Sequence, residues 1–320
     1  MRALLARRGQ DGATEVALTD APLRAPAEGE VVVVVSHSGI NYKDALAVTG
    51  APGILRTLPL IPGVDAVGTL ETDPQRSVVV NGAWLGERID GGFAERVVVP
   101  ADVLAAVPER LGAARTAAIG TAGFTAALAV LALEQRGLPD GPLIVTGAGG
   151  GVGGFAVALL AARGYEVLAS TGRVDALREH LTALGAADVV PRPDAEPGRP
   201  LQSVRWAGGI DAVGGGPLVN VLAQTAWNGA VAACGLAASA GLPGTVMPFI
   251  LRGVALLGVN SVEVDPTRRQ AAWRLMTEHL TPELVDRLTD RTIPLAEVPA
   301  VAPEVLAGRI RGRVVVDVRA

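Results

Sequence analysis

A dense glycine segment constrains this chain more than any other feature. Six glycines fall within residues 147–154, after the apolar stretch 143–146 and before an alanine- and leucine-rich stretch. This order predicts a buried strand, a tight turn and a helix whose first N–H groups point at an anion. A turn that serves only packing is the alternative. The residues predicted to hold a dinucleotide pyrophosphate are Gly149, Gly150, Gly151 and Val152.

The next predicted strand, residues 166–170, indicates which dinucleotide is bound. NAD sites usually carry an acidic residue at the end of this strand, where it binds the ribose 2′-hydroxyl. This chain has an arginine there instead, which suits a 2′-phosphate. One charge-assisted hydrogen bond is worth about 1.5–3 kcal/mol, or roughly a tenfold to hundredfold preference. We therefore expect NADPH at Ser170, Thr171, Gly172 and Arg173, with a solvated helix-start arginine as the alternative.

Composition excludes several classes of protein. A chain of 320 residues is long enough for two domains with separate cores. The net charge of −4 gives no nucleic-acid footprint, and no apolar run suggests a membrane span or a signal peptide, so we expect the cytoplasm. One cysteine and three widely separated histidines make a metal site improbable. No Gly-x-Ser-x-Gly motif points to a serine hydrolase.

Lys43 is the only lysine among 28 basic residues. It lies in a polar segment that follows the predicted strand 30–36, which contains five consecutive valines and is expected to be buried on both faces. A compact ammonium differs chemically from a planar guanidinium, so one retained lysine suggests a specific task. The alternative is a surface residue retained by chance.

The order of elements predicts an α/β fold with two domains. The first 115 residues are rich in strands, whereas residues 115–133 are alanine-rich and helical, and the domain crossover is placed there. Strands are then expected at 188–191, 210–213, 229–235 and 254–259, with helices at 174–184 and 217–227 among them. This alternation predicts a doubly wound parallel sheet that binds ligand at the carboxyl ends of its strands. Residues at those ends are Val213, Gly214 and Gly235.

Several segments together resemble the zinc-free medium-chain dehydrogenase/reductases, in the acryloyl-CoA reductase branch that is also described as quinone oxidoreductases. The most specific segments are Asn41-Tyr42-Lys43-Asp44 and Met247-Pro248-Phe249-Ile250-Leu251-Arg252; others are Ile61-Pro62-Gly63-Val64-Asp65, Gly120-Thr121-Ala122-Gly123-Phe124-Thr125 and Arg311-Gly312-Arg313. The resemblance implies a GroES-like, partly open β-barrel catalytic domain from residues 1–115 and 265–320. It implies a Rossmann NADPH-binding domain from residues 116–264, and a cleft between the domains.

The resemblance also implies a reaction: NADPH transfers hydride to the β-carbon of an activated alkene, usually acryloyl-CoA, and a proton reaches the α-carbon. Hydride addition builds negative charge on the thioester oxygen, which a cation or hydrogen-bond donor stabilises. The expected catalytic residues are Asn41, Lys43 and Asp44, and further cofactor contacts are expected from Tyr42, Thr125 and Arg313.

Each of these residues also has a structural interpretation. The side chain of Asn41 could serve merely to hydrogen-bond the loop backbone, that of Asp44 to cap a short helix over 45–49, and that of Tyr42 to pack against its neighbours. Arg313, on the last predicted strand, could be a surface arginine. We expect His37 to be structural and Cys234 to be a small buried hydrophobe.

Two departures from the family pattern affect the substrate more than the cofactor. The stretch 73–88 is shorter than the family leads us to expect, and Ile89-Asp90 stands where the family usually has His-Trp. A quinone reductase is therefore a second hypothesis, and a non-catalytic NADPH-binding sensor or structural protein is a third. The phosphates of a CoA substrate require a basic patch. Because the arginines are scattered along the chain, the sequence does not show whether they form one. A homodimer through strand 254–259 is expected by analogy alone.

Overall fold

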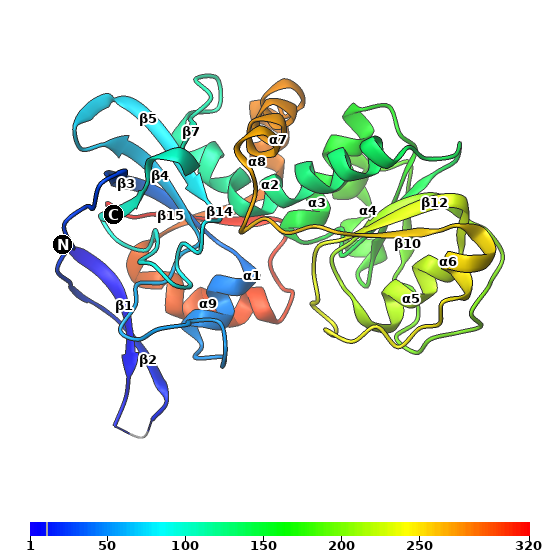
Figure 1. The fold of residues 1–320 in the computed structure, drawn as a ribbon, viewed down its shortest axis with the longest axis horizontal. Helices are drawn as coiled ribbons and strands as arrows, with labels where there is room; N and C mark the ends of the chain where they lie inside the picture. The colour runs from blue at the N-terminus through cyan, green and yellow to red at the C-terminus, as the bar shows by residue number, and fades with distance from the viewer. Residues whose placement is uncertain (11) are drawn as a thin grey trace. The chain divides into compact units, whose positions relative to one another are not determined.

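The computed structural model describes residues 1–10 and 12–320, and the chain divides into two compact units (Figure 1). The first unit comprises Met1–Ala122, Ser261–Trp273 and Thr281–Ala320. The second unit comprises Gly123–Asn260 and Arg274–Leu280.

The first unit is built on a mixed sheet that joins both ends of the chain. The strand order is β14-β15-β3-β4-β5-β7, and β6 also pairs with β3. The strands are β3 (Glu30–Ile40), β4 (Asp65–Leu70), β5 (Asp73–Asn81), β6 (Arg96–Pro100), β7 (Ala105–Ala106), β14 (Thr289–Pro294) and β15 (Arg313–Asp317). A separate hairpin consists of β1 (Arg2–Arg8) and β2 (Thr14–Asp20).

The last strand returns to the first unit, as the sequence predicts, because β15 pairs antiparallel with the end of β3. This pairing explains one difference from the prediction. Strand β3 was expected to end at Ser36 but continues to Ile40, since the backbone of its polar end pairs with β15. The polar segment as far as Ile40 therefore lies on a central strand, and its remaining residues lead into helix α1 (Tyr42–Val48).

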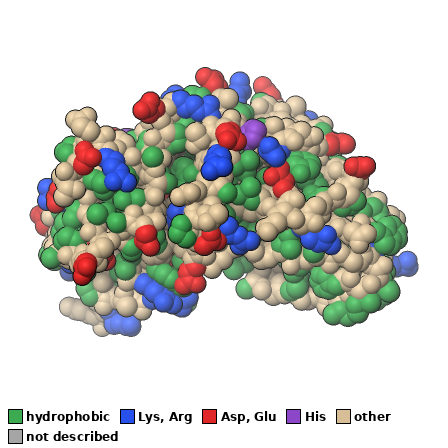
Figure 2. Space-filling view, turned by 45° about the horizontal axis from the view of Figure 1, so that its top comes forward, with side chains coloured by type: hydrophobic (Ala, Val, Ile, Leu, Met, Phe, Trp, Pro, Cys, Tyr) green, Lys and Arg blue, Asp and Glu red, His purple; other side chains and the backbone are tan. Residues whose placement is uncertain are grey.

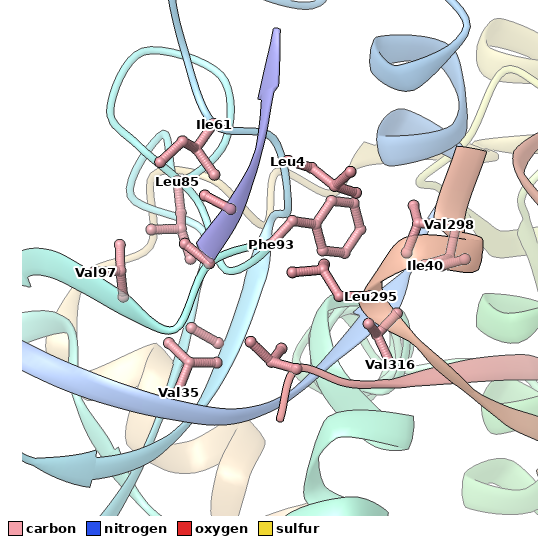
Figure 3. Close-up of a cluster of buried hydrophobic side chains, with 14 of the residues drawn as sticks. Leu4, Val35, Ile40, Ile61, Leu85, Phe93, Val97, Leu295, Val298 and Val316 are labelled. Carbon is pink, nitrogen blue, oxygen red and sulfur yellow. The ribbon is translucent and has the colours of Figure 1, made fainter. Parts of the chain in front are cut away.

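Helices of the first unit cover a hydrophobic core that draws on distant parts of the chain. They are α1 (Tyr42–Val48), α8 (Pro282–Leu288) and α9 (Val298–Leu306), with short 3₁₀ turns at Ala101–Val103 and Leu295–Glu297. Figure 3 shows Leu4, Ile61, Phe93, Leu295 and Val316 of this core, all at most 2% exposed. Helix α7 (Pro266–His279) has residues in both units.

The second unit contains the predicted parallel sheet. Its order is β10-β9-β8-β11-β12-β13, and all neighbours are parallel. The strands are β8 (Leu143–Thr146), β9 (Val167–Thr171), β10 (Asp188–Pro191), β11 (Trp206–Asp211), β12 (Thr225–Ala233) and β13 (Ala255–Gly258). The helix expected over 217–227 ends earlier, because Thr225 already pairs with Trp206 in the sheet.

The helices of this unit indicate where a ligand binds. They are α3 (Gly151–Ala162), α4 (Val174–Ala183), α5 (Gly215–Ala223) and α6 (Met247–Arg252). From β8 the chain passes through α3 to β9 and then through α4 to β10, which lies at one edge of the sheet. From β11 it passes through α5 to β12, toward the other edge. Right-handed crossovers therefore place α3 and α4 on one face and α5 on the other. The order reverses between β8 and β11, and ligands bind at the carboxyl ends beside such a reversal.

Helix α2 (Gly112–Arg136) contains a kink at Gly120, whose φ is 41° and ψ is −148°. By length and composition it is the one helix of the described residues that could cross a membrane, whereas no apolar stretch of that length was predicted from the sequence. Most of its apolar stretch, 83%, is buried inside the structure. Burial on that scale is typical of a core helix.

Candidate functional site

The glycine segment forms a turn at the carboxyl end of β8, and its backbone fits a phosphate group. Gly147 has a φ of +65°, and a Cβ at Gly153 would lie 2.3 Å from the Gly147 carbonyl oxygen. Helix α3 begins at Gly151 after the N-cap Gly150, and no side chain among the described residues caps it. Its first N–H groups are therefore available to an anion. The turn fits the pyrophosphate that the sequence predicts.

Two arginines lie beside this turn. A Cβ at Gly149 would lie 3.4 Å from Nη2 of Arg173 and 3.7 Å from Oγ1 of Thr171. A Cβ at Gly172 would lie 3.5 Å from Nη2 of Arg192. Sequence reasoning missed Arg192, which directly follows β10; the signal was its place after the strand next to β9. The pair forms a cationic edge at the end of β9 that suits a 2′-phosphate.

Ser170 has a structural task. It is fully buried, and its hydroxyl donates to the Pro191 carbonyl at 3.1 Å. The hydroxyl joins β9 to β10, and contact between Ser170 and the cofactor stays a prediction. Thr171 accepts from the Arg173 N–H at 3.2 Å and so fixes the start of α4.

A buried aspartate organises the carboxyl end of β11. Asp211 accepts from the Thr146 hydroxyl at 2.6 Å, which links β8 to β11 at the reversal of strand order. It also accepts from the N–H groups of Val213 and Gly214 at 3.2 and 2.7 Å. Burial raises the pKa of Asp211, and the Thr146 hydroxyl opposes that shift. Asp211 therefore shapes the loop that the sequence assigned to the cofactor.

The remaining predicted residues of the second unit lie near these elements or on α2. Gly235 packs against Ala212, the residue that follows β11, since a Cβ there would lie 2.4 Å from the Ala212 carbonyl oxygen. Thr125 is 5% exposed and lies on α2 after the kink. Cys234 is partly buried and its thiol contacts the Asp211 carbonyl at 3.3 Å. Burial raises the pKa of this thiol to about 12, so it stays protonated.

The first unit holds a buried polar cluster around two carboxylates, Asp44 and Asp65, which are at most 1% exposed. Asp44 accepts from the Asn41 N–H at 2.8 Å and from the Val64 N–H at 2.9 Å. Asp65 accepts from the N–H and the hydroxyl of Thr121, both at 2.7 Å. These bonds join α1, the segment before β4, and α2 of the same unit.

Asn41 and Arg313 complete the cluster. The Asn41 amide donates to Asp44 at 3.2 Å and to Asp65 at 2.6 Å, and its oxygen accepts from Arg313 at 2.9 Å. Both amide hydrogens thus donate within the cluster, an arrangement that favours a positioning role for Asn41 over donation to a substrate oxygen. Arg313 is 3% exposed, donates to the carbonyls of Ala118 and Ile40 at 2.8 Å, and lies 3.5 Å from Asp65.

The cluster contains two acids and one cation, which explains its titration. Burial, together with the neighbouring Asp65, raises the pKa of Asp44 to about 7. Burial also raises the pKa of Asp65, against the attraction of Arg313. One bound proton makes the cluster neutral. Because a buried site of low polarity favours the neutral state, the pKa values of both carboxyl groups are raised.

Glycine permits this cluster at two positions. At Gly120 the backbone leaves the helical conformation, so the Thr121 N–H turns to Asp65. A Cβ at Gly120 would lie 2.4 Å from the Asp65 carboxylate, and one at Gly39 would lie 2.6 Å from the Arg313 guanidinium. Asp65 and Thr121 lie in two of the segments that resemble the family, but the sequence predicted no catalytic or binding role for either residue.

Lys43 lies on α1 and points away from this cluster. Its Nζ donates to Oε1 of Glu87 at 2.8 Å, and the two side chains are 44% and 9% exposed. The Lys43 ammonium thus pairs with Glu87 and not with its neighbour Asp44, which belongs to the buried cluster. Sequence reasoning missed Glu87, because it lies 44 residues further along in a loop. Tyr42, the first residue of α1, is 40% exposed and does not pack in the core.

The Ile89-Asp90 departure from the family pattern has a structural use. The Asp90 carboxylate accepts from the Ile61 N–H at 3.0 Å, and the Gly91 N–H donates to the Ile61 carbonyl. Asp90 thereby fixes the proline-rich segment that leads to Asp65. His37 is partly buried, and its ring lies 3.0 Å from the Ser36 hydroxyl, which agrees with a structural role.

Comparison with known proteins gives matches over nearly the whole chain. Alcohol dehydrogenase GroES-like domains match residues 27–109. A probable acrylyl-CoA reductase of Escherichia coli is 46% identical over 99% of this chain and 100% of its own length. A putative quinone oxidoreductase of Bacillus subtilis is 42% identical over 98% of each.

Solved structures agree with these matches. The yhdH protein of Escherichia coli with bound NADPH has a TM-score of 0.92 and 45% identity, over 99% of each chain. The yhdH oxidoreductase from Salmonella enterica in complex with NADP has a TM-score of 0.93 and 42% identity, over 99% of this chain and 100% of that one. The Bacillus subtilis yhfP structure, with a TM-score of 0.91, contains NAD. The likeness confirms a GroES-like domain and a Rossmann-type sheet.

Proposed function

Because this chain belongs to the acrylyl-CoA reductase and quinone oxidoreductase branch of the medium-chain dehydrogenase/reductases, we propose that it is an NADPH-dependent reductase of an activated carbon–carbon double bond. The leading substrate is an acryloyl-CoA-like enoyl thioester. The observation that carries the proposal is the phosphate-fitting turn at the reversal of strand order, with Arg173 and Arg192 beside it.

The cofactor is NADPH, and the second unit supplies its binding residues. The backbone of Gly149, Gly150, Gly151 and Val152 holds the pyrophosphate, and the two arginines bind the 2′-phosphate. Val213, Gly214 and Gly235 line the neighbouring strand ends, where Asp211 fixes their loop. Tyr42 and Thr125 remain proposed cofactor contacts. When bound, NADPH supplies the hydride.

The first unit supplies charge for the substrate. We assign Lys43 as the cation that stabilises the negative charge on the thioester oxygen, because its ammonium is accessible and held by Glu87. Asn41, Asp44 and Arg313 are positioning residues, since their polar atoms bond to one another and to backbone. They fix the start of α1 and thus the residue beside them, Lys43.

We propose that the reaction is metal-free. The carboxylates of Asp44 and Asp65 already accept from N–H and O–H donors, and the cation that faces Asp65 is a guanidinium. Among the described residues, no three His, Cys, Asp or Glu side chains gather as a possible metal site. In this cluster the Arg313 guanidinium, and not a metal ion, supplies the positive charge that faces the carboxylates.

The test is NADPH oxidation by the purified protein with acryloyl-CoA and with a small quinone in parallel. Thioester turnover that exceeds quinone turnover supports the proposal. Turnover of the quinone alone assigns the protein to quinone reduction, the activity in the name of the Bacillus subtilis relative. Lack of turnover with a broad panel of acceptors, with NADPH still bound, points to a binding protein without catalysis.

The cationic edge predicts the preference between NADPH and NADH. In Arg173→Gln, the Kd for NADPH should rise about tenfold to a hundredfold, because a charge-assisted bond to the 2′-phosphate is lost. The Kd for NADH should stay nearly constant. Binding measured by fluorescence titration distinguishes the two. Arg178→Gln, an exposed arginine of α4 paired with Asp188, is the matched control. An equal loss for both cofactors would contradict a role at the 2′-phosphate.

We also propose a homodimer through the second unit and a cytoplasmic location. Strand β13 lies at the sheet edge, and exposed apolar residues gather near it on and before α6: Val246, Met247, Ile250 and Leu251 are 39–72% exposed. Figure 2 shows green side chains at the right-hand end of the view. Large exposed apolar patches usually mark interfaces. The single, protonated Cys234 suits a reducing compartment.

A further inference from the structure

A cavity of about 530 Å³ opens in the first unit beside β1. Its lining combines three arginines, Arg7, Arg8 and Arg56, with apolar side chains that include Leu5 and Leu58. The backbone of Ala6 pairs with that of Leu60 through two hydrogen bonds, which hold the segment 55–59 against β1. Two stretches about fifty residues apart thus meet to form one basic cavity. Figure 2 shows Lys and Arg side chains gathered at the lower left of the view, the side on which Figure 1 shows β1 and β2.

The charges of this cavity are not neutralised within the described part of the chain. The side chains of Arg7 and Arg56 have no hydrogen-bond or ion-pair partner there, and Arg8 reaches only the Gly12 carbonyl at 3.5 Å. No acidic residue lines the cavity. Other exposed arginines of this unit, such as Arg24 and Arg115, form ion pairs at 2.5 and 2.7 Å. Three arginines that form no ion pair with another described residue thus line one cavity, and such a cluster attracts a polyanion.

On the basis of the proposed function, we propose that this cavity binds the 3′-phospho-ADP head of a coenzyme A thioester. That head carries three phosphate groups and an adenine ring, and the cavity offers three guanidinium groups beside apolar side chains. Arginine binds phosphate through two parallel hydrogen bonds, whereas the apolar side chains suit the faces of a base. The cavity volume lies within the range of about 300–1,000 Å³ that is usual for ligand sites.

The cavity is connected to the proposed catalytic cation within the same unit. The Arg56 N–H donates to the Glu87 carbonyl at 2.8 Å, and the Glu87 carboxylate holds Nζ of Lys43 at 2.8 Å. The long pantetheine arm of coenzyme A separates the phosphates from the thioester. With the head bound at Arg56, the pantetheine arm would extend past Glu87 and bring the thioester to Lys43. A quinone has no such head, so the cavity favours the thioester as substrate.

A larger cavity of about 670 Å³ in the second unit is a weaker candidate for the same head. It is lined by Arg192, Arg199 and Arg205, but also by Asp194. Asn220, another lining residue, uses its amide to hold the loop at Gly198, Gln202 and the Asp194 carbonyl. Arg192 lies beside Gly172, where the cofactor phosphate is proposed. This cavity therefore belongs with the cofactor.

The test compares substrates with and without the head, in the full chain with Arg8→Gln and Arg56→Gln combined. The KM for acryloyl-CoA should rise at least about tenfold, which corresponds to about 1.4 kcal/mol. The KM for the N-acetylcysteamine thioester of acrylate, which lacks the head, should stay constant, as should kcat for both. Arg76→Gln, an exposed arginine on β5, is the matched control and should leave both KM values unchanged.

Calorimetry with adenosine 3′,5′-bisphosphate, in saturating NADP⁺ to fill the cofactor site, provides a second readout. The wild type should bind this probe, and the double variant should bind it at least about tenfold more weakly. Unchanged KM for acryloyl-CoA together with unchanged probe binding would overturn the assignment. Wild-type inactivity with both thioesters refutes the proposed function instead, and calorimetry then decides about the cavity independently.

Discussion

Replacing Arg313 by methionine is expected to lower the Tm of the first unit by about 10 °C. The substitution keeps much of the side-chain volume but leaves Asp65 and Asp44 buried without their cation. Removing one partner of a buried ion pair costs about 3–5 kcal/mol, because the remaining charge is uncompensated. At about 2–4 °C per kcal/mol for units of 150–250 residues, this gives the expected shift.

The loss should grow with pH. The folded pKa of Asp44, raised to about 7, lies above its unfolded value of about 3.9. Stability from the bound proton is therefore complete below the unfolded pKa and is lost as pH rises through about 7. Without the guanidinium, both carboxyl groups bind protons more tightly still. Melting of Arg313→Met should accordingly differ more from the wild type near pH 8 than near pH 5.

The control is Arg76→Met, which removes an exposed arginine of β5 and should leave the Tm within about 1 °C. A pH-independent difference between Arg313→Met and the wild type would show that the loss comes from packing. An unchanged Tm would contradict the account of the cluster altogether.

Replacing Lys43 by methionine is expected to lower kcat with acryloyl-CoA by about a hundredfold to a thousandfold, the effect of losing one group that stabilises an oxyanion. The KM for NADPH should change little, because the assigned task concerns the substrate oxygen. The Tm should also change little, since the ion pair with Glu87 is partly exposed and such pairs contribute about 0–1 kcal/mol. Steady-state kinetics and melting curves measure both expectations.

A matched control separates catalysis from loss of an ion pair. Arg115 is 39% exposed and pairs with Asp286 at 2.7 Å, much as Lys43 pairs with Glu87. Arg115→Met should leave kcat unchanged. If Lys43→Met instead raises the KM for NADPH while kcat persists, Lys43 binds the cofactor. If neither value changes, the only lysine of the chain has no part in the reaction.

The structure shows that local pattern predicts much of the second unit. Alternating apolar stretches and glycine turns gave the parallel sheet, and β13 lies at its edge as expected. Arg173 lies beside the glycine turn, as its spacing of one helix and one strand from that turn predicts, and its contact with the cofactor stays a prediction. The error at the end of α5 was also local: an apolar run does not by itself say where a helix ends and the next strand begins.

The first unit shows where sequence alone was insufficient. A short helix was predicted over 45–49, but it spans Tyr42–Val48 with Asn41 as its N-cap; the strand that begins at Glu30 was correctly predicted. The roles predicted for Asn41 and Asp44 differ from their contacts, because their partners Val64, Asp65 and Arg313 lie far away in the chain. Arg313 could not be distinguished from a surface arginine until β15 was paired with β3.

By itself, the sequence determined most of the elements and predicted the phosphate turn and the arginine that indicates NADPH, because each depends on residues close by in the chain. The uniqueness of Lys43 is a fact of composition. Only the tertiary structure decided that Glu87 holds Lys43, that Arg313 is buried beside Asp65, and that Arg7, Arg8 and Arg56 share a cavity. The physical reason is that charge pairing acts through space. Which arginine meets which anion depends on strand pairing and loop closure, which no local pattern records.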